Sequence, residues 1–287
     1  MNLGILHTGI RKDEKLLIDA TTKQNINFEL FDLRTQKLDP ADKPGWSRFD
    51  AVLERCISTV RGNAAIKFFT NLGISTFNSK NVAAICNDKF QTSTILEEAN
   101  VPVVKSVLVF DASTATKVVK ELGDYPIVLK SRSGSWGRLI AKINDPEALE
   151  AVFDHKGYMG PEHAAVIVQE YIDKYNGRDI RAFVLGGEVI AAIYRKSEHW
   201  ITNTARGGQT SNCKLTPELS NICKRASDAV GGGILAMDLF ETENRGLIIN
   251  EINHTMEFKN SEAPTGVNIS GKVIEYIIKQ INNENYE

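Results

Sequence analysis

ILAMDLFETENRGLIINEINHTMEFKNS (Ile234–Ser261) is the stretch around which the rest of the chain is organised. Its apolar runs predict two strands, Leu235–Glu241 and Gly246–Asn253, because each run ends at polar residues that favour turns. A short polar turn, Thr242–Arg245, separates the two runs. The stretch therefore predicts a β-hairpin followed by a loop.

Polar side chains interrupt both predicted strands. Side chains alternate between the faces of a strand, so the second strand has Leu247, Ile249, Glu251 and Asn253 on one face and Ile248, Asn250 and Ile252 on the other. In the first strand, Asp238 points opposite to Leu235, Met237 and Leu239. Carboxylates inside apolar strands are costly unless something pairs with them. The oxygens of Asp238, Glu251 and Asn253 suit Mg²⁺, although a solvated sheet face with Asp238 paired to a lysine remains open.

Composition bounds the class of protein. With 287 residues, 42% of them hydrophobic and 24% charged, the chain is long enough for two or three compact lobes of a soluble protein. A formal net charge of −2 gives no global attraction to nucleic acid or membrane. No apolar run approaches a membrane span, and the first ten residues read as a strand instead of a signal peptide. The four cysteines form no CxxC pair, so a cytoplasmic protein with reduced thiols is expected.

The first part of the chain alternates between strands and helices. The expected strands are residues 2–7, Phe28–Leu33, Ala51–Glu54 and Ser75–Asn78, and the expected helices are Arg11–Thr22 and Arg61–Leu72. This alternation predicts a small open α/β lobe with a parallel sheet. The lobe has no GxGxxG fingerprint, so a dinucleotide site has no support.

Two lysines stand where a phosphate could bind. Lys89 follows a capping aspartate, Asp88, in the first turn of a helix predicted at Lys89–Ala99. Since a cation is poorly matched to a helix N-terminus, it could serve a bound phosphate. Lys130 ends an apolar strand and leads into the Gly/Ser loop Ser131–Arg138 (SRSGSWGR). Such a loop can bring N–H groups close to phosphate oxygens, and an ordinary flexible loop is the alternative.

The middle of the chain predicts further strands with polar interruptions. Ala165–Ile172 carries Gln169–Glu170, which could present backbone groups and a carboxylate to a purine ring. A hairpin is expected at 177–195, and a short strand is expected at His199–Asn203 before Arg206 and two glycines. Helices are expected at Ser113–Leu122, Asp145–Lys156, Leu215–Val230 and Gly271–Ile281.

The order of these features along the chain resembles that of the ATP-grasp superfamily, and most of all its RimK-like branch. The features are the two lysines, the Gly/Ser loop, the Gln–Glu strand end and the possible metal ligands Asp238, Glu251 and Asn253, which are called the metal clamp below. The segments that carry the resemblance are GSWGR, QEYI, GRDIR, HWITNTARGG and NEINHTMEFKNS. The resemblance implies an ATP-grasp fold that combines α/β and α+β lobes. It implies a pre-ATP-grasp domain at 1–85, a central lobe at 86–168 and a C-terminal lobe at 169–287.

The resemblance also assigns roles to residues. ATP would be bound by Lys89, Lys130, Gly134, Ser135, Trp136, Gly137, Arg138, Gln169, Glu170, Tyr171, Ile172, Asp179, Arg181, Arg195 and Asn203. Mg²⁺, as two ions, would be bound by Asp238, Glu251 and Asn253. The substrate would be held by Asn203, Thr204, Arg206, Gly207, Glu257, Phe258, Lys259, Asn260 and Ser261. Lys130, Arg195 and Arg206 would assist the chemistry.

The implied activity is ADP-forming ligation of a carboxylate to an amine through an acyl phosphate. Within the branch, the chain resembles ligases that join α-aminoadipate to the C-terminal glutamate of the small acidic carrier protein LysW in lysine biosynthesis. The sister group that uses glutamate carries Gly-Phe after Glu-Phe-Lys, where this chain has Asn260–Ser261. Glutamate as substrate, dual specificity, another RimK-like ligase and a non-catalytic ATP-binding regulator are the alternatives. A homo-oligomer without nucleic-acid or membrane partners is expected.

Overall fold

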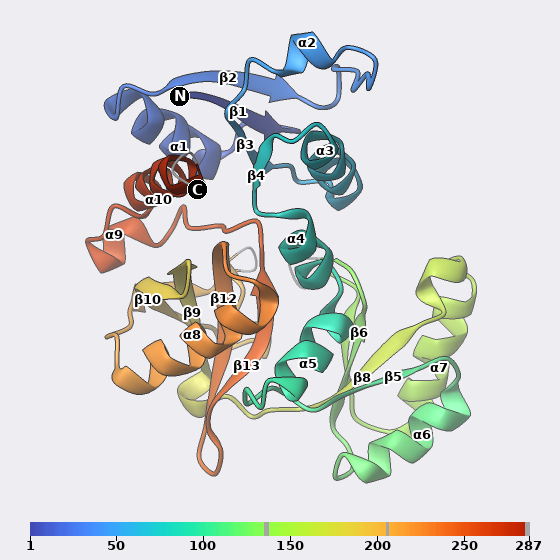
Figure 1. Ribbon diagram of the computed structural model, residues 1–287. Coiled ribbons are helices and arrows are strands. Elements are labelled where there is room, and N and C mark those ends of the chain that lie inside the picture. Colours follow the sequence, from blue (N-terminus) through green and yellow to red (C-terminus); the bar gives the residue numbers. More distant parts are fainter. Residues whose placement is uncertain (135–137, 205–206, 285–287) are drawn as a thin grey trace.

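The computed structural model describes residues 1–134, 138–204 and 207–284. Within these ranges the strands form three sheets, and helices pack against them (Figure 1). No helix in the described ranges is long and apolar enough to cross a membrane. The mixed architecture confirms the fold class expected from the sequence.

The first sheet is parallel and has the strand order β2–β1–β3–β4. Its strands are β1 (Asn2–His7), β2 (Asn27–Asp32), β3 (Ala51–Arg55) and β4 (Ser75–Phe77), and its helices are α1 (Lys12–Lys23), α2 (Lys43–Trp46) and α3 (Thr59–Asn71). The prediction of an open parallel sheet is confirmed. Because the strands run in one direction, their carboxyl ends meet at one edge, which is where ligands of such sheets bind.

The second sheet is antiparallel in the order β5–β8–β6–β7. Its strands are β5 (Ser106–Val109), β6 (Ile127–Ser131), β7 (Ile140–Ile143) and β8 (Val166–Glu170). The helices α6 (Ala112–Glu121) and α7 (Pro146–Gly157) pack on one face, and η1 (Pro161–His163) precedes β8. Alternate apolar residues such as Ile127, Leu129 and Val168 are buried under these helices, which leaves the other face of the sheet for the site.

The third sheet is antiparallel in the order β11–β10–β9–β12–β13. Its strands are β9 (Arg178–Leu185), β10 (Glu188–Lys196), β11 (Gln209–Asn212), β12 (Ile234–Thr242) and β13 (Gly246–Asn253). One face packs on α4 (Lys80–Cys86), α5 (Lys89–Glu98) and α8 (Pro217–Val230). Two short helices flank the sheet along the chain: η2 (Tyr175–Gly177) precedes β9, and α9 (Glu262–Thr265) follows β13. As predicted, Asp88 caps α5, since its carboxylate accepts hydrogen bonds from the N–H groups of Phe90 and Gln91.

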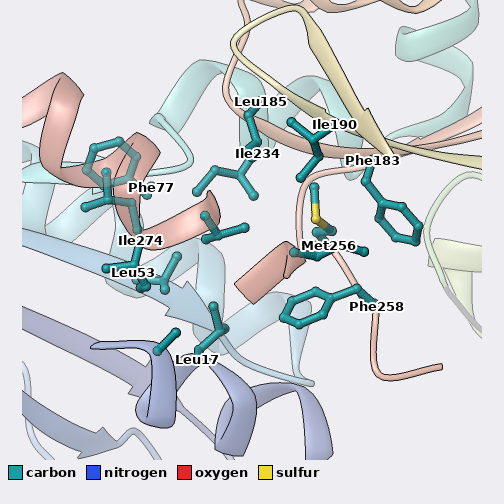
Figure 2. Close-up of a cluster of buried hydrophobic side chains, with 14 of the residues drawn as sticks. Leu17, Leu53, Phe77, Phe183, Leu185, Ile190, Ile234, Met256, Phe258 and Ile274 are labelled. Carbon is teal, nitrogen blue, oxygen red and sulfur yellow. The ribbon is translucent and has the colours of Figure 1, made fainter. Parts of the chain in front are cut away.

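One hydrophobic core joins the first sheet to the third. Leu17 and Leu53 from the first lobe meet Phe183 and Ile234 from the third sheet, and Ile274 of α10 (Ile269–Glu284) packs between them (Figure 2). The C-terminal helix therefore covers the N-terminal lobe, and α1 and α10 lie side by side (Figure 1). This shared core fixes the N-terminal lobe against the sheet that carries Asp238 and Glu251.

The strand expected at His199–Asn203 is wrong. The segment has no regular secondary structure, and the fifth strand of the sheet is β11, which the sequence did not suggest. Side chains bind the backbone of the segment in place of a neighbouring strand. The Trp200 carbonyl accepts from Lys174 Nζ at 2.7 Å, and the Ile201 N–H donates to His199 Nδ1 at 3.0 Å. The β-prone composition of the segment is thus overridden by tertiary contacts.

Candidate active site

A cavity of about 200 Å³ lies where the three sheets meet. Its walls come from β6 and β8 of the second sheet, from β9, β12 and β13 of the third, and from loops that follow β3 in the first. Most of the residues that the sequence predicted for a nucleotide site line this one cavity, as the next paragraphs set out.

The predicted metal clamp is brought together. Asp238 on β12 and Glu251 on β13 are cross-strand partners, and both line the cavity with Asn253. The pairing shifts after Asp238, because Leu239 pairs with Ile249 and Asn250 is passed over. This β-bulge re-aims side chains, so Asn250 also lines the cavity. The expectation from strict alternation, that Asn250 faces away from Glu251, is wrong.

Asp238 is neutralised by arginines and not by a lysine. Arg181 binds it through two hydrogen bonds of 2.8 Å, and Arg195 Nη2 lies 3.1 Å from Oδ2. Burial alone would raise the pKa of Asp238, but the two guanidinium groups outweigh it and hold that pKa well below its usual range. Arg195 in turn binds both oxygens of Asp179, at 2.7 and 2.8 Å. The result is a rigid buried network of charges at one wall.

Two lysines from different elements converge on β13. Lys89 Nζ lies 3.2 Å from Glu251 Oε1 and donates to the Gly134 carbonyl at 2.6 Å. Lys130 Nζ donates to Asn250 Oδ1 at 2.8 Å. Lys130 is 7% exposed, and burial lowers its pKa to about 8. Cations and carboxylates are thus held within one small volume, which suits a polyphosphate with its metal ion.

The predicted phosphate loop and adenine segment border the same cavity. Gly134 and Arg138 line it, whereas Ser135, Trp136 and Gly137 lie outside the described residues. All four residues of 169–172 (Gln169, Glu170, Tyr171 and Ile172) line it as well. The carboxylate of Glu170, however, accepts from the Lys105 N–H at 2.8 Å and pairs with Arg245 at 2.9 Å. Its charge is therefore committed within the protein.

The predicted substrate residues divide into two groups. Asn203, Thr204 and Glu257 line the cavity, but Gly207, Phe258, Lys259, Asn260 and Ser261 are not among its lining residues, and Arg206 lies outside the described residues. Phe258 and Ser261 are buried in the protein. The loop turns inward because the carboxylate of Asp13, on α1, accepts from the N–H groups of Phe258 and Lys259 at 2.6 and 2.8 Å.

Residues of the N-terminal lobe also line this cavity, which was not predicted from the sequence. Arg11, Glu54, Thr59 and Asn63 all line it, as does Asn87 just after this lobe. The one available signal was the position of Glu54 at the carboxyl end of a parallel strand. The neighbouring Arg55 is buried in an ion pair with Glu14 at 3.1 Å. Lys174 is a further missed lining residue, and burial lowers its pKa.

The donor set fits a hard divalent cation. Two carboxylates and one amide, from Asp238, Glu251 and Asn253, offer the oxygen ligands that Mg²⁺ prefers. Asn253 Nδ2 is buried and has no hydrogen-bond partner in the described structure; as a donor it suits an acceptor such as a phosphate oxygen, and the amide oxygen is the atom that could bind the cation. The described residues contain no group of three or more His, Cys, Asp or Glu side chains arranged for a metal. With Asp238, Glu251 and Asn253 as its protein ligands, such an ion would keep coordination positions for phosphate oxygens or water.

Comparisons with known proteins agree with this geometry. Residues 86–277 match the RimK-like ATP-grasp domain, and residues 3–85 match the LysX preATP-grasp domain. The chain is 31% identical to the glutamate–LysW ligase ArgX of Sulfurisphaera tokodaii over 93% of this chain and 95% of that one. It is also 31% identical to the alpha-aminoadipate–LysW ligase LysX of the same organism, over 98% of each chain.

A solved structure shows the same fold. The RimK domain ATP-grasp protein of Sphaerobacter thermophilus superposes with a TM-score of 0.79 at 24% sequence identity. The match covers 96% of this chain and 99% of that one. The arrangement of three sheets around the cavity is therefore a known fold.

Proposed function

Because the chain belongs to the RimK-like ATP-grasp family and is an ATP-dependent carboxylate–amine ligase, we propose that it joins α-aminoadipate to the carrier protein LysW. The α-amino group would form an amide with the side-chain carboxylate of the carrier's C-terminal glutamate, as a step of lysine biosynthesis. Support comes from the similarity to ligases that are named for LysW.

The choice of α-aminoadipate rests on Asn260–Ser261, because the resemblance drawn from the sequence implies Gly-Phe at these positions in ligases that use glutamate. Neither residue lines the cavity. Their influence would act through the backbone of the loop that begins at Glu257, which does line it. Glutamate is the second candidate, since the similarity to a glutamate–LysW ligase is as high, at 31% identity.

We propose that ATP lies between the lobes 86–168 and 169–287, with the lobe 1–85 closing the far end. The adenine would contact Gln169–Ile172, and the triphosphate would lie along Lys89, Lys130 and Gly134–Arg138. Asp238, Glu251 and Asn253 would hold Mg²⁺, which when bound supplies positive charge to the phosphoryl group that moves. Asp179 and Arg181 would close the nucleotide site, with Asn203 beside it.

The protein's own groups do the remaining work by position and charge. Phosphoryl transfer depends on alignment and charge neutralisation more than on a protein nucleophile. Lys130 would carry positive charge to the transferred phosphoryl group, because its amine is already fixed at Asn250. Arg195 touches Asp179 and Asp238, so its part is to hold Asp238 in place and to add to the local positive field.

The observation that carries the proposal is the convergence of Lys89 and Lys130 on the carboxylate-bearing strand β13 within one cavity. The test is ADP release from Mg-ATP with purified LysW, with α-aminoadipate or glutamate added in parallel. Release that requires both the carrier and α-aminoadipate supports the proposal. A preference for glutamate would assign the enzyme to arginine synthesis. ADP release without LysW would indicate another RimK-like ligase.

A further inference from the structure

One cavity carboxylate is left without a counter-charge. Of the carboxylates that line the described part of the cavity, those of Glu170, Asp179, Asp238, Glu251 and Glu257 are each in an ion pair. Glu54, at the end of β3, is in none. The neighbouring guanidinium group, of Arg55, is turned to Glu14 at 3.1 Å. Arg55 still favours the charged form of Glu54, but burial outweighs it, so among the described residues the cavity contains one buried acid that forms no ion pair.

Glu54 is nevertheless held in a fixed position. It is 4% exposed. Its Oε1 accepts from the Cys56 N–H, and its Oε2 accepts from Thr255 Oγ1 at 3.0 Å. A Cβ at residue 62 of α3 would lie 2.5 Å from Oε1, so the absence of a side chain at Gly62 makes room for the carboxylate. Contacts from both the N-terminal lobe and the C-terminal loop thus orient this group.

These hydrogen bonds do not require a charge. A neutral glutamine could accept from the Cys56 N–H with its amide oxygen and donate to the Thr255 hydroxyl with its amide nitrogen, without the cost of placing an ion out of water. Burial raises the pKa of Glu54, which reflects that cost. A cationic ligand would offset it, because an ion pair is worth most where water is excluded.

Apart from the guanidinium group of Arg55, which acts on Glu54 electrostatically, the side chains described next to it are polar and hydrogen-bonded to one another. His254 Nε2 hydrogen-bonds Asn87 Oδ1 at 3.1 Å, and Asn87 Nδ2 donates to Asn63 Oδ1 at 2.7 Å. These hydrogen bonds connect His254, the neighbour of Thr255 in the sequence, to Asn87, which is two residues before Lys89. Glu54 thus lies on the side of the cavity that carries Thr255 and, through His254, Asn87.

We propose that Glu54 binds the ammonium group of the amine substrate. The inference rests on the proposed function, which places an amino acid with a reacting α-amino group in this cavity. The amine must lose one proton before it reacts, and Glu54 is its acceptor. The freed nitrogen lone pair forms the C–N bond to the acyl carbon, and the bond from that carbon to the phosphate oxygen breaks with its electron pair on phosphate.

The test uses Glu54→Gln, which keeps the size of the side chain and an acceptor oxygen. We expect kcat/KM for α-aminoadipate to fall on the order of tenfold or more, the loss typical of a hydrogen bond to a charged group. Hydroxylamine, which is small and uncharged near neutral pH, can trap the acyl phosphate in place of the amino acid. With LysW and Mg-ATP, the variant should form hydroxamate within twofold of the wild-type rate.

The outcomes separate this inference from the proposed function. Failure of the wild type to form LysW hydroxamate counts against the proposed function. Wild-type hydroxamate formation with an unchanged kcat/KM for α-aminoadipate in the variant overturns the role of Glu54, and so does an equal loss of both reactions. If the variant does not fold, the wild type is tested with α-hydroxyadipate as a competitor. Binding at least tenfold weaker than that of α-aminoadipate supports the role of Glu54, and equal binding refutes it.

Discussion

The amine of Lys130 on β6 donates to Asn250 Oδ1 on β13 at 2.8 Å, and this bond crosses the cavity from the second sheet to the third. Asn250 is the residue that the β-bulge passes over. An irregularity in one strand thus supplies the acceptor that fixes a cation from another lobe. One contact thus links the two sheets and fixes the position of a cation in the cavity.

We predict that Mg-ATP binding weakens as pH rises through 8. Burial lowers the pKa of Lys130 to about 8, from 10.5, so the folded protein loses this charge above pH 8 while the unfolded chain keeps it. The dissociation constant for Mg-ATP should rise roughly tenfold per pH unit above 8, as expected for one required proton. Titration calorimetry from pH 7 to 9 measures it.

The control is Lys130→Arg, because a guanidinium group stays charged throughout this range. Its Mg-ATP affinity should not vary with pH in this window. A wild-type affinity that is equally flat would contradict the role of Lys130. In the folding equilibrium the sign is the opposite, since the unfolded chain binds more protons between pH 8 and 10.5 and the contribution of Lys130 to the free energy of unfolding rises there.

Glu251→Gln should abolish ADP formation and leave the protein folded. The change removes a charge from the proposed metal clamp and leaves Lys89 without its ion-pair partner at 3.2 Å. We expect a loss of roughly 10²–10³-fold or more in ADP release, as for other groups that stabilise developing charge. Glu241→Gln is the matched control, since Glu241 pairs with Arg178 outside the cavity. Full turnover by Glu251→Gln would rule out the metal assignment.

Arg195→Ala should destabilise the fold. It would leave Asp179 buried without its main partner and remove one of the two arginines from Asp238, a loss of about 3–5 kcal/mol in the free energy of unfolding. Arg178→Ala breaks a partly exposed pair with Glu241 and should cost about 1 kcal/mol or less. Urea denaturation compares them. Equal losses for the two variants would show that the buried network is not a stabilising unit.

Asp13→Ala should impair use of the amino acid more than use of ATP. The carboxylate of Asp13 holds the N–H groups of Phe258 and Lys259, and the loop begins at Glu257 in the cavity wall. Leaving the buried Phe258 N–H unpaired costs about 1–3 kcal/mol, and the part-buried N–H of Lys259 costs less because water can reach it. We expect a lower melting temperature and a higher KM for the amino acid. A rise in KM for ATP alone would argue against this link.

The sequence predicted most strands correctly because their apolar runs are bounded by turn residues. It also brought Asp238, Glu251 and Asn253 together, since neighbouring strands of a hairpin have a short separation along the chain. It failed where contacts are long-range. The hydrogen bond between Asp13 and Phe258 joins residues 245 positions apart. No local sequence pattern predicts that Phe258 is buried in the core.

Other misses have local but hidden causes. The bulge at Asn250 changes which side chains face the cavity, and strict alternation cannot reveal it. The segment His199–Asn203 has the composition of a strand, yet Lys174 and His199 itself hold its backbone outside the sheet. Glu54 was not predicted because its proposed role follows from a comparison: the other described carboxylates of the cavity are in ion pairs, and Glu54 is not. This comparison needs the ion pairs of the folded protein, which the sequence does not give.

The most direct test is the mass of LysW after incubation with the enzyme, Mg-ATP and an equal mixture of α-aminoadipate and glutamate. The account predicts that the carrier gains the mass of one α-aminoadipyl residue at its C-terminal glutamate for each ADP released. A carrier that gains glutamate in preference, or ADP release with no change in the mass of LysW, would contradict it.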